Sequence, residues 1–229
     1  HALYHAHVQA IPFENIDVLR GRPVRLDLPS LEAKLVHDRR GGYCFEQNTL
    51  LLGVLRQLGF EARLIGGRVR YQRPRAYMPP RTHAFVRVEV EGEAWLMDVG
   101  MGGISLTAPI RLNFEGSQTT PHDTRRILHE GEVCYQQLSF GGAWLDVCEF
   151  TLEEMHPIDC EVGNWYTSTS PDSPFMSRLL VACALYDGGR ATLLNHELTV
   201  RAHDGQATVR VLKTHDELRS VLAEQFGIA

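Results

Sequence analysis

The spacing of the apolar residues changes at Gly59, and this change constrains the fold more than any other feature of the sequence. Before it, apolar residues recur at the spacing of one helix face, as they do from Cys44 to Leu58. After it, apolar and polar residues alternate, as in strands with one buried face. The first sixty residues are therefore predicted to be mainly helical, and the middle third to be an antiparallel sheet or small barrel.

Two alternating runs, Ala84 to Val90 and Glu93 to Val99, flank the dipeptide Glu91-Gly92. This pattern is typical of a hairpin with a two-residue turn. The last third is predicted to contain a helix around Phe175–Leu185, a β-meander over 191–213 and a closing helix over His215–Phe226. Helices, then a sheet, then a sheet with a helix make an α+β protein of three parts.

Composition narrows the function classes. Apolar residues make up 44% of the 229 residues and charged residues 22%, which excludes a disordered chain. The net charge is −5 and there is no dense Lys/Arg run, which argues against nucleic acid and anionic membranes as partners. No window approaches the ~18 apolar residues of a membrane-spanning helix, and no secretory signal opens the chain. A cytoplasmic location is expected, and because residue 1 is His1, an earlier segment is expected to be missing.

The five cysteines form an odd, widely spaced set without a Cys-x-x-Cys pair. This argues against a disulfide framework or structural zinc, and it favours a reducing compartment. His156 with Cys160, and His129 with Cys134, lack further ligands at matching spacing, so no metal site is predicted. Four cysteines are expected to be buried thiols, and Cys44 is the exception.

Cys44 follows the Gly41-Gly42 break, in the first turn of a predicted helix. Unpaired N–H groups and the helix dipole at such a position favour an anionic thiolate. The same N–H groups can stabilise an oxyanion on an attacked carbonyl, and the glycines let the backbone turn sharply and approach a substrate. A buried structural cysteine is the alternative, and position alone does not decide between the two.

The hairpin offers a base for this thiol. With a two-residue turn, Phe85 lies opposite Asp98, and His83, on the same face as Phe85, becomes the diagonal neighbour of Asp98. The carboxylate would then orient the imidazole, which would deprotonate Cys44. A register shifted by one residue would put His83 and Asp98 on opposite faces of the sheet.

A glycine-rich run, Gly100-Met101-Gly102-Gly103, directly follows Asp98 and Val99. Successive glycine N–H groups can bind a phosphate, although glycines after a strand more often only make a turn. Because the run adjoins a candidate catalytic carboxylate, we predict a phosphate loop made by Gly100, Gly102 and Gly103.

Several segments together resemble the arylamine N-acetyltransferase family, and they follow the family's order across nearly the whole chain. They are Ile11–Asp17, Arg40–Asn48, Pro80–His83 and Asp98–Gly103, with Asn164–Thr169 and Ser173–Phe175 similar to the approach to the family's interdomain helix. The set is far more specific than any one of its parts.

The resemblance implies an α+β fold with an N-terminal helical domain, a central antiparallel β-barrel and a C-terminal α/β lid around a cysteine-protease-like Cys-His-Asp core. The implied borders are residues 1–60 for the helical domain with the nucleophile, 61–162 for the barrel with His and Asp, 163–184 for an interdomain helical segment, and 185–229 for the lid.

The resemblance also implies the chemistry. Cys44, His83 and Asp98 would form the triad of a ping-pong acetyltransferase. Acetyl-CoA would be a co-substrate, with no tightly bound cofactor, and the acceptor a small arylamine, arylhydrazine or N-hydroxyarylamine. The implied acceptor site consists of Phe13, Tyr43, Phe45, Thr82, Met101, Gly102 and Phe175, next to the donor phosphate loop. Bacterial members often have an aromatic residue at position 101, and the flexible Met101 thioether would reshape this cleft.

Two alternatives stay open on the sequence. A transglutaminase-like cysteine hydrolase shares the chain order Cys, His, Asp and the acyl-enzyme intermediate. A binding module with a decayed site is the other, although all three triad residues are present. Whether the chain forms a homo-oligomer is also left open.

Overall fold

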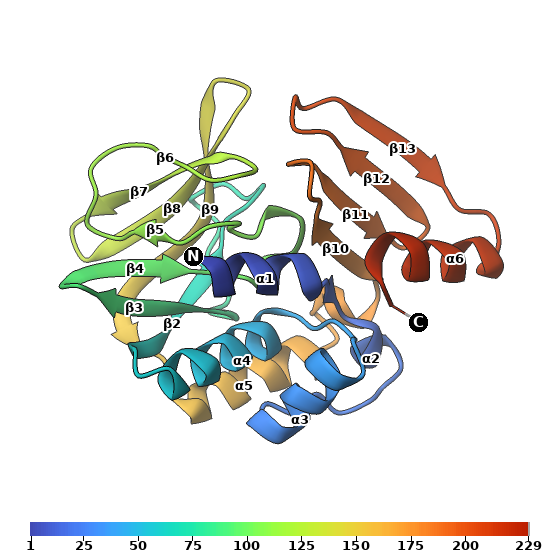
Figure 1. Cartoon of the computed structure of the whole chain (residues 1–229), viewed down its shortest axis with the longest axis horizontal. Helices are drawn as coiled ribbons and strands as arrows, with labels where there is room; N and C mark the ends of the chain where they lie inside the picture. The colour runs from blue at the N-terminus through green and yellow to red at the C-terminus, as the bar shows by residue number, and fades with distance from the viewer. Residues whose placement is uncertain (229) are drawn as a thin grey trace.

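A computed structural model describes residues 1–228 (Figure 1). Its helices are α1 (Ala2–Ala10), α2 (Ile16–Leu19), α3 (Leu28–Glu32), which continues as a π-helical stretch (Ala33–His37), α4 (Cys44–Gln57), α5 (Pro157–Thr169) and α6 (His215–Phe226). Short 3₁₀ turns span Gly102–Ile104 and Pro174–Met176. None of the helices within this described part is long and apolar enough to cross a membrane.

Eight antiparallel strands form a nearly closed barrel, as predicted. In chain order they are β2 (Glu61–Val69), β3 (His83–Val90), β4 (Glu93–Met97), β5 (Ile110–Arg111), β6 (Gln118–Thr119), β7 (Thr124–Glu130), β8 (Val133–Phe140) and β9 (Ala143–Glu154). The spatial order runs β5-β4-β3-β2-β9-β8-β7-β6. The two edge strands are bridged by the Gln118 side chain, which bonds the backbone N–H and carbonyl of Arg111 at 2.8 and 2.9 Å.

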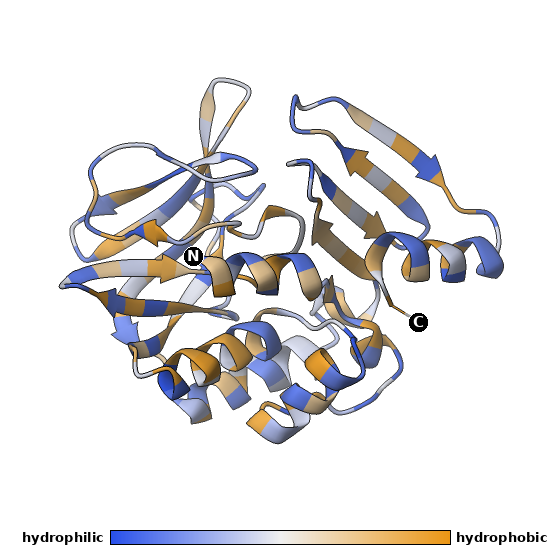
Figure 2. Cartoon of the chain, viewed as in Figure 1, coloured by the Kyte–Doolittle hydropathy of each residue, from blue (hydrophilic) through white to orange (hydrophobic). Residues whose placement is uncertain are grey.

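A second sheet has the order β1-β10-β11-β12-β13. Its strands are β1 (Phe13–Glu14), β10 (Leu180–Ala184), β11 (Arg190–Leu194), β12 (Glu197–Arg201) and β13 (Ala207–Val211), and α6 packs against it. Polar and apolar residues alternate along these strands (Figure 2). The predicted meander and closing helix are confirmed, but edge strand β1 comes from the predicted helical part of the chain.

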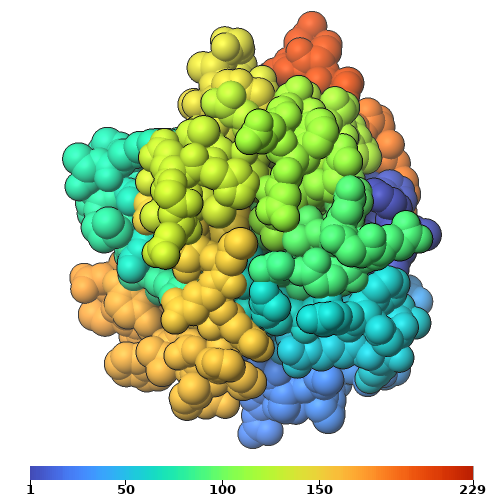
Figure 3. All heavy atoms as spheres, turned by 90° about the vertical axis from the view of Figure 1, so that its left-hand side faces the viewer, coloured from blue at the N-terminus to red at the C-terminus, as the bar shows by residue number. Residues whose placement is uncertain are grey.

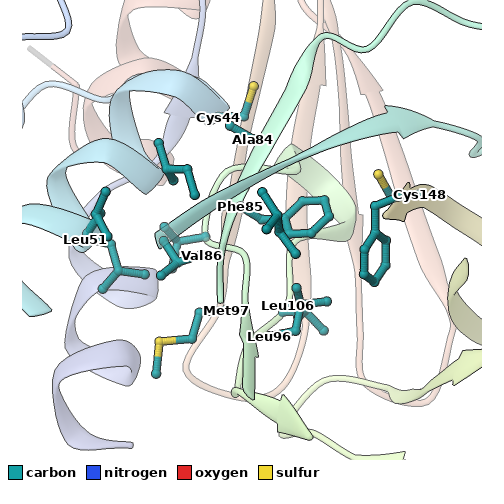
Figure 4. Close-up of a cluster of buried hydrophobic side chains, with 14 of the residues drawn as sticks. Cys44, Leu51, Ala84, Phe85, Val86, Leu96, Met97, Leu106 and Cys148 are labelled. Carbon is teal, nitrogen blue, oxygen red and sulfur yellow. The ribbon is translucent and has the colours of Figure 1, made fainter. Parts of the chain in front are cut away.

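The main core lies between α4 and the barrel. The inner face of α4 packs on β2 and β3, where Leu51, Phe85 and Val86 are almost fully buried. In Figure 4, Cys44 lies at the edge of this cluster beside Ala84, and its sulfur points away from the apolar side chains. Figure 3 shows the barrel strands lying above the helical layer on one side of the molecule. The start of α4 therefore meets the barrel where the core ends.

The prediction of a helix around Phe175–Leu185 is wrong. This stretch contains only the end of a 3₁₀ turn and then β10, which pairs with β1 on one side and β11 on the other. A short apolar run fits a helix or a buried strand equally well, and two flanking strands decide the matter here. In the predicted interdomain segment 163–184, the helix is α5, which begins earlier, at Pro157, and ends at Thr169. The four domain borders stay predictions.

Candidate active site

The β3–β4 hairpin brings His83 and Asp98 together. Val90 pairs with Glu93, so the predicted register is confirmed, and the turn residues Glu91 and Gly92 have φ angles of 52° and 80°. Positive φ at both positions is the geometry of a type I′ hairpin turn. The Nε2 atom of His83 lies 2.8 Å from Oδ2 of Asp98. The sequence therefore fixes this pair through local turn geometry.

The surroundings of the pair set its charge state. Burial alone would lower the pKa of His83, but Asp98 and Cys44 outweigh it and raise that pKa to about 10. Burial opposes ionisation of Asp98, but His83 and hydrogen bonds from Asn48 and Gly100 lower the pKa of this carboxyl group below its ordinary value. At neutral pH the imidazole is therefore protonated and the carboxylate charged.

Cys44 is the first residue of α4 and is 5% exposed. Its Sγ lies 3.8 Å from the carbonyl oxygen of Thr82, the residue before His83. Because Asp98 bonds Nε2 of His83, the other ring nitrogen, Nδ1, is the one available to exchange a proton with Cys44. The structure thus brings all three predicted triad residues together at the junction of α4 and the hairpin.

Gly41 and Gly42 permit close packing inside the protein rather than an approach to substrate. A Cβ atom at Gly41 would overlap the Pro12 carbonyl, and one at Gly42 would lie 2.8 Å from the Glu46 carboxylate. Neither residue has a positive φ. The N–H of Gly42 donates to the Pro12 carbonyl, and the Gly42 carbonyl accepts from the N–H of Glu14. The glycines therefore lock the segment before Cys44 onto β1.

Charged side chains form hydrogen bonds and ion pairs around the start of α4. The carboxylate of Glu46 accepts hydrogen bonds from the backbone N–H of Tyr43 at 3.0 Å and from the ammonium group of Lys34 at 2.6 Å. Burial outweighs Lys34 and raises the pKa of Glu46 to about 7. Arg40 pairs with Glu14 at 2.7 Å. The segment from Arg40 to Tyr43 is therefore fixed at its first residue by Glu14 and at its last residue by Glu46.

Sequence reasoning missed the role of two residues. The Asn48 amide donates to the Ala84 carbonyl at 2.7 Å and to Asp98 Oδ1 at 3.1 Å. Its spacing from Cys44, one helical turn, was a usable signal because it places both on one face. The hydroxyl of Tyr4 accepts from the backbone N–H of Asp98 at 3.1 Å, and nothing local in the sequence pointed to it.

A cavity of about 410 Å³ opens over Cys44 and His83. Five of the predicted acceptor residues line it: Phe13, Thr82, Met101, Gly102 and Phe175. Within the described residues, Tyr43 and Phe45 are not part of this lining, and both are completely buried. The Phe45 ring fills the space beside Gly163, and the Tyr43 ring packs on Phe175 at 5.4 Å. Tyr43 therefore supports a wall residue from behind, which is a correction to its predicted role.

A second cavity, of about 960 Å³, lies between the barrel and the C-terminal sheet and shares part of the first cavity's lining. Met101 and Gly103 are among the residues that line both, so the glycine run lies where the two cavities adjoin. The N–H of Gly100 is occupied, because it donates to Asp98 Oδ1 at 3.1 Å. This removes Gly100 from the predicted phosphate donors. A Cβ atom there would also overlap the backbone of Cys44.

The charge of the second cavity is unlike that of the whole chain. Its charged lining comprises Arg73, Arg178, Arg190 and Arg201 with Asp123 and Asp204. Four cations against two anions leave a positive surplus in a protein whose net charge is −5. Such a groove suits an anionic ligand. Among residues 1–228, no three His, Cys, Asp or Glu side chains gather in an arrangement that could hold a metal ion.

Comparisons with known proteins agree with this geometry. A model of the N-acetyltransferase family matches residues 1–229. The arylamine N-acetyltransferase of Escherichia coli strain K12 is 44% identical over 227 residues, which cover 99% of this chain and 80% of the relative. An arylamine N-acetyltransferase / N-hydroxyarylamine O-acetyltransferase of Salmonella typhimurium is 43% identical with the same coverage.

Solved structures of arylamine N-acetyltransferases also match the fold of this chain. The Salmonella typhimurium arylamine N-acetyltransferase superposes with a TM-score of 0.94 at 41% identity, covering 98% of this chain and 82% of the other. The Mycobacterium marinum enzyme in complex with CoA gives a TM-score of 0.94 at 35% identity, covering 99% and 84%. Fold, site and sequence agree, and the chain belongs to the arylamine N-acetyltransferase family of acyltransferases.

Proposed function

We propose that this chain transfers an acetyl group from acetyl-CoA to arylamines, arylhydrazines or N-hydroxyarylamines through an acetylated Cys44. The observation that carries the proposal is the 2.8 Å contact between His83 and Asp98 beside Cys44, at the wall of an apolar cavity. A helix-start thiol next to an oriented imidazole has the parts that nucleophilic acyl transfer requires.

In the first half-reaction, His83 already holds the proton of the Cys44 thiol as an imidazolium, and the Cys44 sulfur attacks the thioester carbonyl as a thiolate. The negative charge that develops on the carbonyl oxygen is stabilised by N–H groups at the start of α4. The C–S bond to CoA then breaks, and the departing CoA sulfur takes the proton from His83. Because one thioester replaces another, the step is nearly balanced in free energy.

In the second half-reaction, a neutral amine attacks the acetyl carbon on Cys44 and gives its proton to His83. The bond from the acetyl carbon to Sγ breaks, which restores the Cys44 thiolate beside the protonated His83. Weakly basic aromatic amines suit this step because they are neutral at working pH. The aromatic wall formed by Phe13 and Phe175 favours such acceptors.

The donor is proposed to lie in the second cavity, with its thioester reaching Cys44 past Met101 and Gly103. The positive surplus of that groove matches the phosphates of CoA. The CoA complex of the Mycobacterium marinum relative supports a CoA-based donor.

The decisive experiment mixes the protein with acetyl-CoA alone and measures its intact mass. We expect one acetyl group on Cys44 that leaves when an arylamine is added, and none on Cys44→Ala. A screen of anilines, hydrazines and alkylamines, followed by CoA release, then identifies the acceptor class. Absence of the adduct together with turnover of a glutamine peptide would favour the hydrolase instead. A Cys44 no more reactive toward iodoacetamide than free cysteine would favour a decayed site.

A further inference from the structure

The loop from Asp98 to Leu106 is fixed by hydrogen bonds from three separate elements of the fold. Its ends are joined by the N–H of Leu106, which donates to the Asp98 carbonyl at 3.1 Å. Three consecutive carbonyls at its far end each accept a hydrogen bond from a long side chain of a different element. The pairs are Arg125 to Ile104 at 2.8 Å, Arg190 to Ser105 at 3.0 Å, and Tyr4 to Leu106 at 3.1 Å. These donors come from β7, β11 and α1.

Arg190 belongs to a buried cluster of two arginines and one aspartate, which has one more cation than anion. Its Nη2 atom lies 2.6 Å from Oδ2 of Asp123, and Arg125 pairs with the same carboxylate at 2.7 Å. Two guanidinium groups thus share one carboxylate, and none of the three side chains is more than 13% exposed. Burial, together with Arg125, lowers the pKa of Arg190 despite the attraction of Asp123.

The need to pair the Asp123 charge does not explain this surplus cation. Asp123 keeps two hydrogen bonds from Arg125 whether or not Arg190 is present. Breaking a buried pair is costly because it leaves a charge unpaired, whereas removing Arg190 leaves no charge unpaired and loses only the hydrogen bond to the Ser105 carbonyl. The presence of Arg190 in this cluster therefore points to a contribution to function.

We propose that Arg190 is a positioning residue for the loop Asp98–Leu106. The loop packs on Cys44 at Gly100, on the Phe13 ring at Gly102 and on the Thr192 side chain at Gly103. It forms part of the wall of both cavities and carries one member of the proposed triad. By fixing the Ser105 carbonyl, Arg190 ties this wall to the C-terminal sheet and holds it against Cys44. The inference rests on the proposed function, whose chemistry takes place at that wall.

A simpler role would be to supply positive charge to the donor groove. The chain offers a matched comparison, because Arg201 on β12 is the cross-strand partner of Arg190 and lines the same cavity. Its guanidinium donates to the Gly205 carbonyl, far along the chain from the loop. Arg190→Met and Arg201→Met remove the same charge from the same groove, but only the first releases Ser105.

The test measures kcat and KM for Arg190→Met, Arg190→Lys and Arg201→Met with two acyl donors, acetyl-CoA and the phosphate-free p-nitrophenyl acetate. We expect Arg190→Met to lower kcat with both donors by about tenfold to a hundredfold, the cost of misplacing a reacting group. Urea unfolding should show a loss of no more than about 1–3 kcal/mol, from the unpaired Ser105 carbonyl. Arg190→Lys should recover most of kcat, because one ammonium group has donors for both Ser105 and Asp123. The surface variant Arg210→Met serves as the handling control.

Three results would overturn the inference. The first is a normal kcat of Arg190→Met with p-nitrophenyl acetate. The second is a defect like that of Arg201→Met, a raised KM for acetyl-CoA alone. The third is a loss of stability that accounts for the lost activity. A wild-type protein that acetyl-CoA does not acetylate would instead overturn the proposed function, and this inference with it.

Discussion

The side-chain amide of Asn48 lies 3.1 Å from Oδ1 of Asp98, on the opposite side of the carboxylate from His83. Asn48 follows Cys44 by one turn of α4, so a single side chain joins the helix of the nucleophile to the strands of the base. It also accepts from the backbone N–H of Val99 at 3.2 Å. The relative position of helix and hairpin is therefore set by a buried polar contact.

Asn48→Ala should lower kcat by about tenfold to a hundredfold, since a small displacement of reacting groups has that effect. It should also reduce the free energy of unfolding by about 1–3 kcal/mol, because it leaves buried backbone groups unpaired. Steady-state kinetics and urea unfolding measure both. The control is Thr49→Val on the same helix, since the Thr49 hydroxyl has no hydrogen-bond partner among residues 1–228. Equal effects of the two substitutions would contradict the bridging role.

Asp98→Asn should keep the fold and lower kcat by about 10³–10⁴-fold, as loss of the orienting carboxylate does in other triads. The substitution also removes the charge that raises the pKa of His83, so that pKa should fall from about 10. Stopped-flow acetylation of Cys44 and NMR titration of the His83 ring test the two effects. Activity near that of the wild type would mean that the carboxylate does not orient His83.

The His83–Asp98 pair should make stability depend on alkaline pH. The folded-state pKa of His83 is raised from 6.5 to about 10, so its contribution is complete below pH 6.5 and is lost as pH rises through 10. The difference in unfolding free energy between wild type and His83→Asn should therefore shrink from pH 6.5 to pH 10. A difference that stays constant across this range would show that the ring is not protonated in the fold.

His7 should make the protein sensitive to acid. Burial lowers its pKa from 6.5 to about 4, against the opposing hydrogen bond with Gln47. The unfolded chain binds a proton in this window and the folded chain does not, so stability falls as pH drops from 6.5 to 4. His7→Gln should flatten this part of the stability curve in urea titrations. An unchanged slope would assign the acid sensitivity to other groups.

Gly100→Ala should impair activity, because a Cβ atom at this position overlaps the backbone of Cys44 and comes within 2.9 Å of the Asn48 amide. We expect a loss of kcat of at least about tenfold, from displacement of the nucleophile. Gly92→Ala is the comparison, because its Cβ would enter open space at a positive φ. That variant should lose about 1 kcal/mol of stability and keep its activity. Full activity of Gly100→Ala would contradict the close packing.

Apolar spacing and turn residues, which act over a few residues of the chain, predicted most of the elements correctly. The closing helix begins and ends where its apolar spacing predicts, at His215 and Phe226. The Glu91-Gly92 turn sets the hairpin register and hence the pairing of His83 with Asp98. In each case the deciding interactions lie within a few residues along the chain, where spacing and turn geometry leave one solution.

Contacts between distant segments escaped the same reasoning. The stretch around Leu180 became a strand because β1, more than 160 residues earlier, pairs with it. Tyr43 became a buried support because α5 covers it, and its hydroxyl bonds the Asn164 side chain.

The sequence by itself determined most of the helical and β regions and the hairpin register, and it predicted Cys44, His83 and Asp98 as nucleophile, base and carboxylate. Only the tertiary structure decided which side chains hold them in place, as Asn48, Tyr4 and Arg190 do. The physical reason is that hydrophobic period and turn type act between near neighbours. A buried donor, by contrast, takes whichever acceptor the packing of the whole chain brings to it.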